Sequence, residues 1–159
     1  MRNVLIRALV ALIVLTPSVS RAQATHPDYS GTFVLDTALS DHGRMVPSAM
    51  TLKITQTPTA VTVDRSQTTQ MGETTTSMKY ATDGSTSKNQ LTMGGNAVDV
   101  STVVTWEAAV PVFTSAMKFG DNDAQSVEKW SLDGKTLTIN RTVSVGGQQF
   151  SNKLVLTKQ

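Results

Sequence analysis

Short runs of alternating apolar and polar residues, each ended by a turn signal, constrain this chain more than any other feature of its sequence. The runs recur about every 8–12 residues, and no long segment repeats at helical spacing. The chain is also rich in Thr, Ser and Val, which favour strands. The pattern predicts ten strands, near residues 30–36, 49–57, 60–69, 73–81, 86–93, 97–106, 110–118, 124–132, 135–145 and 148–158.

Two turn signals near the C-terminus predict the strand register. If Gly146 and Gly147 form a two-residue turn, the large apolar residues on both sides fall on one face, which a slip by one residue would destroy. The resulting pairs are Val145 with Gln148, Val143 with Phe150, Ile139 with Leu154, and Leu137 with Leu156. A turn at Asp133 and Gly134 pairs Trp130 with Leu137 on the same face.

This arrangement predicts an all-β, antiparallel up-and-down meander. Closing the meander into a barrel of about eight to ten strands removes its exposed edges. Residues 37–48, after the first strand, are the one connection long enough for a short helix or a lid loop. Residues 25–159 form a single domain of ordinary size.

The N-terminus is typical of a cleaved secretory signal over residues 1–24. Arg2 and Arg7 precede the apolar run "ALVALIVL", and "AQA" provides the small residues that a signal peptidase reads. The apolar run is shorter than the roughly 20 residues that a membrane-spanning helix needs. We expect cleavage near Ala24 and a secreted or periplasmic protein.

Composition excludes several classes of function. The chain has no cysteine, so disulfides, thiolate metal sites and a cysteine nucleophile are excluded. Its formal net charge of +2 becomes −1 without the three arginines of the signal, which argues against a nucleic-acid partner. No cofactor motif is present, and we expect no cofactor.

Several motifs resemble those of small secreted bacterial lipocalin-like proteins of unknown function. They are "SGTF" followed by "VLDTALSD" (30–41), "MTLKITQT" (50–57), "EKWSLDGKTLTI" (128–139) and the ending "KLVLTKQ". The resemblance implies a calycin-type barrel that binds small lipophilic molecules or structures other assemblies. It also implies that Gly31 permits close backbone approach at the closed end and that Phe33, where the signature has Trp, plugs that end. Phe33 as an ordinary core aromatic is the alternative.

Polar residues on the apolar face are the best candidates for a site. Arg141 faces Asn152 in the predicted register, and Glu128 shares the face of Trp130, diagonal to Arg141. Arg65 follows Val61 and Val63 on their face and can join this cluster. Arg141 or Arg65 would receive a ligand carboxylate. The alternative is that Glu128 neutralises Arg141 in an interior salt bridge.

Large apolar side chains would form the walls of a ligand cavity or fill a packed core. The candidate ligand contacts are Met78, Tyr80, Trp106 and Trp130. Methionine adapts to irregular ligands, although an eight-stranded barrel is already narrow enough for side chains to fill. The other large groups are Met50, Met93, Phe113, Met117 and Phe119.

Motifs for catalysis and metal binding are weak. "SDHG" contains Ser40, Asp41 and His42, but adjacent residues cannot converge as a hydrolase triad. "DND" (121–123) lacks the later ligands of a calcium loop and is typical of a hairpin turn. "NRT" (140–142) fits a glycosylation acceptor but lies within a strand.

Three hypotheses of function follow from these residues. The first is a binding protein for a small apolar or amphipathic molecule held inside the barrel. The second is a non-catalytic structural or interaction module of the cell envelope, which would have a filled interior and an exposed apolar patch or open sheet edge. The third is an enzyme with Glu128 as a general acid or base, for which we find no nucleophile or metal site.

Overall fold

The computed structural model describes residues 26–41, 46–70, 72–93 and 95–159, and all of its regular structure is β. The ten strands follow the predicted runs to within a few residues. They are β1 (Gly31–Leu35), β2 (Ala49–Gln56), β3 (Ala60–Thr69), β4 (Gly72–Ala81), β5 (Thr86–Met93), β6 (Asn96–Glu107), β7 (Val110–Phe119), β8 (Asn122–Asp133), β9 (Thr136–Val145) and β10 (Gln148–Lys158).

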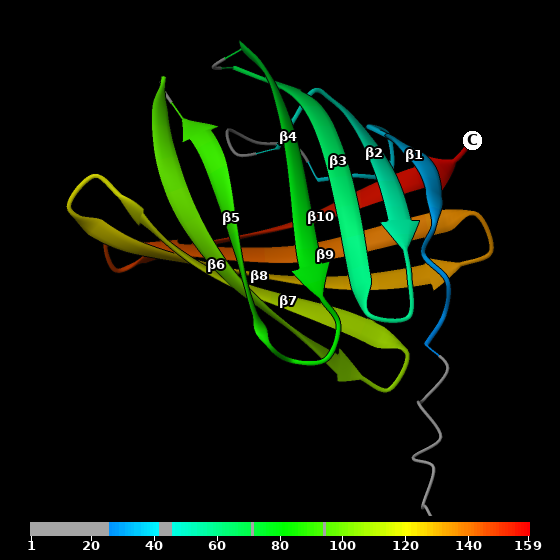
Figure 1. Ribbon diagram of the computed structural model, residues 1–159. Helices are drawn as coiled ribbons and strands as arrows, with labels where there is room; N and C mark the ends of the chain where they lie inside the picture. The colour runs from blue at the N-terminus through cyan, green and yellow to red at the C-terminus, as the bar shows by residue number, and fades with distance from the viewer. Residues whose placement is uncertain (1–25, 42–45, 71, 94) are drawn as a thin grey trace, which may run out of the picture.

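The strands form one antiparallel sheet that curls into a nearly closed barrel (Figure 1). Strands that follow one another in the chain are paired, except β4 and β5, and β1 also pairs with β10, so the first and last strands join. The hydrogen-bonded order runs from β4 through β1 and β10 to β5. β4 and β5 leave their common turn without a backbone ladder between them, and this line is the seam of the barrel. The predicted up-and-down meander is confirmed.

Side chains hold the seam together in place of a backbone ladder. The amide of Asn89 accepts a hydrogen bond from the backbone N–H of Lys79 at 2.9 Å and donates one to the Lys79 carbonyl at 3.0 Å. The hydroxyl of Ser87 accepts a hydrogen bond from the N–H of Ala81 at 2.7 Å. Asn89 therefore supplies the two bonds that a paired strand would have supplied to Lys79.

Replacing Asn89 with Ala should open the seam locally. The amide of Lys79 loses its acceptor, and a hydrogen bond contributes roughly 1 kcal/mol, so we expect exchange of this amide to be about five-fold faster. Amide hydrogen exchange followed by NMR measures this effect. Asn140→Ala, at an exposed position of β9, is the control. Equal protection of Lys79 in both variants would mean that Asn89 does not hold the seam.

The register of the last hairpin is as predicted, and that of the preceding one differs by two residues. Val145 pairs with Gln148 and Ile139 with Leu154 across the Gly146-Gly147 turn. The predicted pairing of Trp130 with Leu137 is wrong, because Trp130 pairs with Ile139. The loop residues are Gly134 and Lys135, and Gly134 takes the positive φ of 56° that a first loop position favours. A shift of two keeps every side chain on its face.

Aromatic residues fill the end of the barrel where the described chain begins. Tyr29 is buried in the core. Its hydroxyl is 3.1 Å from the carbonyl oxygens of Ala109 and Trp130, and it can donate a hydrogen bond to either. The rings of Trp106 and Trp130 are both 6.5 Å from that of Tyr29. Apolar side chains of β1, β2, β9 and β10 complete this packed half, which closes one end of the interior.

Gly31 and Phe33 contribute to this closed end. Phe33 is fully buried between Lys158 of β10 and Leu52 of β2 in the ladder. The Lys158 ammonium lies 5.6 Å from the centre of the Phe33 ring and donates to the Ser30 carbonyl. A Cβ at Gly31, where φ is +146°, would overlap the Lys158 side chain. Gly31 thus leaves room for the Lys158 side chain of the last strand, and Phe33 is a core aromatic.

The described part of the connection after β1 is a turn that is held by side-chain hydrogen bonds. Of the two predicted alternatives, a short helix and a lid loop, the helix is not found in residues 37–41 and 46–48. The Asp36 carboxylate accepts hydrogen bonds from the N–H groups of Ala38 and Leu39, and the Ser40 hydroxyl accepts one from the N–H of Val155. Such side-chain bonds compete with helix formation. His42 and the predicted signal, residues 1–24, lie outside the described residues.

Candidate functional site

A cavity of about 240 Å³ lies inside the barrel, beyond the aromatic end. It is smaller than the 300–1,000 Å³ of most pockets for drug-sized ligands. Its walls come from seven strands, β3 to β9, and it reaches both sides of the seam. The lining residues are Val63, Arg65, Gln67, Thr76, Met78, Tyr80, Leu91, Val100, Phe113, Ser115, Met117, Ser126, Glu128, Arg141 and Val143. The hypothesis that the core is packed throughout does not hold for this half of the interior.

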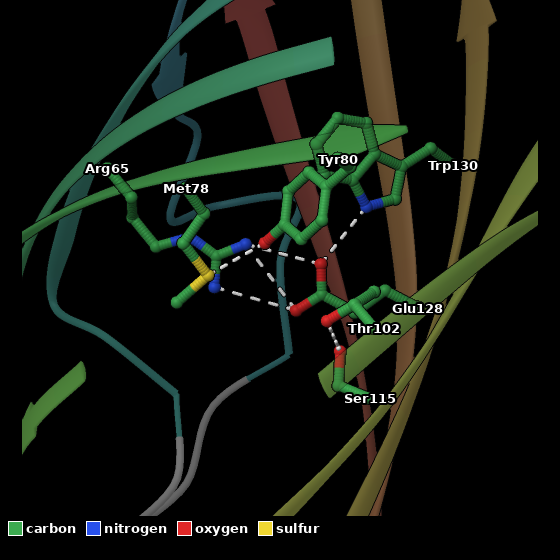
Figure 2. A network of polar contacts seen from close by, with 7 residues as sticks. All are labelled: Arg65, Met78, Tyr80, Thr102, Ser115, Glu128 and Trp130. Atoms are coloured by element: carbon green, nitrogen blue, oxygen red, sulfur yellow. Dashed lines mark hydrogen bonds and ion pairs between the residues drawn. The ribbon is translucent and has the colours of Figure 1, made fainter. Parts of the chain in front are cut away.

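An ion pair crosses the cavity from one wall to the other. Arg65 on β3 directs its guanidinium at Glu128 on β8, with 3.2 Å between Nη2 and Oε2 (Figure 2). Both side chains are largely buried, with exposed fractions of 20% and 14%. The indole Nε1 of Trp130 donates a second bond to Oε2 at 3.1 Å. Strands far apart in the sheet are therefore joined through the barrel interior.

Arg141 lies directly opposite Glu128 in the ladder of β8 and β9. The prediction placed it diagonally, and the two-residue difference in the β8–β9 register explains why. One predicted alternative paired Glu128 with Arg141, and Arg65 also makes an ion pair with this carboxylate. Arg141 interacts with Glu128 electrostatically across the strand pair. One carboxylate and two guanidinium groups thus line the cavity, which gives these charged groups a sum of +1.

Electrostatics distinguish the two arginines. Burial opposes the charge of Arg65, but Glu128 more than offsets it and raises the pKa of Arg65. Burial also disfavours the charge of Arg141, and there the attraction of Glu128 does not offset burial and repulsion by Arg65, so the pKa of Arg141 is lowered. Burial would raise the pKa of Glu128, yet Arg65, Arg141 and the Trp130 N–H together lower it. The site therefore combines a carboxyl group whose charged form is favoured with two guanidinium groups.

Tyr80 and Met78 form the apolar wall beside the ion pair. Tyr80 donates its hydroxyl hydrogen to the sulfur of Met78, with 2.8 Å between the heavy atoms, and its ring packs edge-on against Phe113 at 5.1 Å (Figure 2). Burial raises the pKa of Tyr80 well above its ordinary value, so the phenol stays neutral. Thr102 and Ser115 share a hydrogen bond of 2.8 Å on the opposite wall.

Five of the eight predicted ligand contacts line the cavity: Arg65, Met78, Tyr80, Glu128 and Arg141. The other three lie nearby or elsewhere. Trp130 packs in the core and holds Glu128. Asn152 is buried opposite Arg141, and Trp106 stacks on His26 at 3.6 Å and donates to the Thr82 carbonyl. Contact of any of the eight with a ligand stays a prediction.

Several lining residues were missed because small and uncharged polar residues attract little notice in a sequence. Gln67 is the most informative, since its Oε1 is buried and has no hydrogen-bond partner among the described residues. Thr76, Ser115 and Ser126 are the other polar ones. The available signal was the alternation of side chains along a strand, which places residues two positions apart on the same face. Gln67 follows Arg65 by two, Ser115 follows Phe113 by two, and Ser126 precedes Glu128 by two.

Other candidate chemistry finds little support in the described residues. They contain no group of three or more His, Asp or Glu side chains that would hold a metal ion. A general acid needs a raised pKa, whereas the pKa of Glu128 is lowered by its ion pair. Asp121 lies in the turn between β7 and β8, and Asn122 and Asp123 begin β8, where Asp123 makes an exposed ion pair with Lys118. Asn140 lies within β9.

A larger hollow of about 550 Å³ lies at the hairpin ends of β7–β8 and β9–β10. It is an open depression, and the exposed Lys118–Asp123 pair is on its wall. Because this depression is open, the interior cavity is the better candidate site.

The described residues include no helix that is long and apolar enough to cross a membrane.

Comparison with known proteins supports the fold alone. No protein-family model matches the chain, and no curated protein matches it. Among solved structures, it is similar to secretory abundant heat soluble protein 4 from Ramazzottius varieornatus, with a TM-score of 0.53 and 15% sequence identity. The match covers 82% of this chain and 94% of that one. The likeness agrees with a lipocalin-like barrel.

Proposed function

We propose that this protein binds a small amphipathic anion inside its barrel. The observation that carries the proposal is a cavity with two arginines and one carboxylate on otherwise mostly apolar walls. An anionic head beside Arg141 would balance the excess positive charge, and a guanidinium suits a carboxylate because two parallel hydrogen bonds can form. The apolar body would contact Met78, Leu91 and Met117.

The size of the cavity limits the ligand. A volume of about 240 Å³ favours a molecule smaller than a typical drug, or a longer one that extends out of the barrel. Burial of its apolar surface contributes about 25 cal/mol per Å² before the loss of motional freedom is subtracted. We expect the affinity to depend on both the charged head and the apolar tail.

Three probes with the same tail and different heads test the proposal. Isothermal titration calorimetry of the purified protein would compare octanoate, octanol and octylammonium. Octanoate should bind at least tenfold more tightly than octanol, and octylammonium should not bind, because the cavity already has a cationic excess. Equal affinities for octanoate and octanol would contradict the proposal that the arginines anchor the anionic head. Binding of none of the three would favour the structural or interaction module, for which the seam offers a sheet edge.

We also propose that the chain acts after export. The basic, apolar and small-residue segments of residues 1–24 support a secretory signal, and the structural neighbour is itself named as a secretory protein. The intact mass of protein purified from its own cells tests this. A chain that begins at Thr25 is the expected result, and a chain that retains Arg2 and Arg7 would contradict it.

A further inference from the structure

One lining residue points to a second requirement on the ligand besides its charge. The Oε1 of Gln67 is buried, and no donor among the described residues reaches it. Gln67 lines the cavity, on the same face of β3 as Arg65. A buried acceptor without a donor is destabilising, and native structures satisfy nearly all such groups.

The position of Gln67 gives the direction of this second contact. β3 begins at Ala60, at the end filled by aromatic residues, and ends at Thr69. Gln67 is therefore one inward-facing position, about 7 Å, farther from the aromatic end than Arg65. The neighbouring inward residue on β2 is Met50, which is buried and whose thioether side chain has no hydrogen-bond donor.

We infer that the ligand carries a hydrogen-bond donor, such as a hydroxyl group, in addition to its anionic head, and that Gln67 selects for this donor. The inference rests on the proposed function and narrows its ligand from any amphipathic anion to a hydroxylated one. The head would lie near Arg141, and the hydroxyl group would lie nearer the far end of β3. Plain and hydroxylated chains would then differ in affinity because only the latter satisfies Gln67.

The test compares octanoate with hydroxyoctanoates that carry the hydroxyl group at different carbons. Calorimetry with the wild-type protein should give at least one isomer that binds about tenfold more tightly than octanoate, in line with one added buried hydrogen bond. In Gln67→Leu, which keeps the bulk and removes the acceptor, the ratio of the affinities for this isomer and for octanoate should fall to about one. Gln149→Leu, at an exposed position of β10, should keep the preference.

The outcomes separate the two proposals. If octanoate binds but no isomer exceeds it, water satisfies Gln67 and the inference is wrong, while the proposed function stands. If the preference persists in Gln67→Leu, another group such as Thr76 or Ser115 accepts the hydroxyl hydrogen, which also overturns the assignment. If neither class of probe binds, both proposals fail together. Thermal unfolding of each variant checks that the fold is kept.

Discussion

Glu128→Gln is expected to lower the free energy of unfolding by about 3 kcal/mol. Removing one partner of a buried ion pair leaves the other charge uncompensated, which costs about 3–5 kcal/mol, and the residual exposure of this pair places it at the lower end. Two guanidinium groups, Arg65 and Arg141, would then face each other without a carboxylate. Urea unfolding at pH 7, followed by tryptophan fluorescence, measures the change.

Glu107→Gln is the matched control for this prediction. Glu107 pairs with Lys129 at 2.8 Å, but both side chains are about half exposed. Exposed pairs contribute little, so we expect a change within about 0.5 kcal/mol. If both variants lost the same small amount, the ion pair inside the barrel would not be a significant link between β3 and β8.

The loss of stability in Glu128→Gln should depend on pH. The folded pKa of Glu128 is depressed below its ordinary value of 4.5. The stability that its charge provides is therefore complete above about pH 4.5 and is lost as the pH falls through the depressed folded pKa. The difference in unfolding free energy between the wild-type protein and Glu128→Gln should be largest near neutral pH and shrink in acid. A constant difference down to strongly acid pH would contradict the depressed pKa.

Arg141→Met should weaken octanoate binding about 30-fold. Hydrogen bonds to charged groups contribute about 1.5–3 kcal/mol, and this substitution removes one of the two guanidinium groups of the cavity while keeping an apolar side chain of similar length. Octanol, which has no charge to lose, should bind as before. Calorimetry of both probes gives the two affinities, and a parallel loss for octanol would point to damage of the cavity rather than loss of an anchor.

The stability of Arg141→Met provides the check on folding. Because burial lowers the pKa of Arg141, the folded protein holds this charge less easily than the unfolded chain does. We expect the free energy of unfolding to stay within about 1 kcal/mol of the wild-type value or to rise. Lys118→Met, which removes an exposed cation and the same unit of net charge, should leave octanoate binding unchanged.

Arg65 and Arg141 should therefore differ when each is replaced by Met. Loss of Arg65 removes the short ion pair and leaves Glu128 with only Arg141 opposite it, so stability falls. Loss of Arg141 leaves the Arg65–Glu128 pair intact, so ligand affinity falls instead. This contrast assigns a structural task to one arginine and a binding task to the other, a division that residue type alone does not reveal.

The strands, their faces and the last hairpin were predictable from the sequence. Alternation with a period of two is a local property, because successive side chains of a strand point to opposite faces. Gly146 and Gly147 determine the register between β9 and β10, and that register correctly placed Arg141 opposite Asn152. The register across the turn at Gly134 differs by two from the predicted one because either residue pair that includes this glycine can form a two-residue loop, and the observed loop pairs Trp130 with Ile139.

What only the tertiary structure decided is which charged and polar groups meet inside the barrel. Arg65 and Glu128 are 63 residues apart, and they meet because closure of the sheet brings β3 opposite β8. No local pattern contains that contact, so the sequence could place both residues on the inward face but not pair them. The same reason hid Gln67, whose buried Oε1 has no hydrogen-bond partner in the described part of the chain. The amino-acid sequence determined the faces of the strands, and closure of the barrel determined the neighbours.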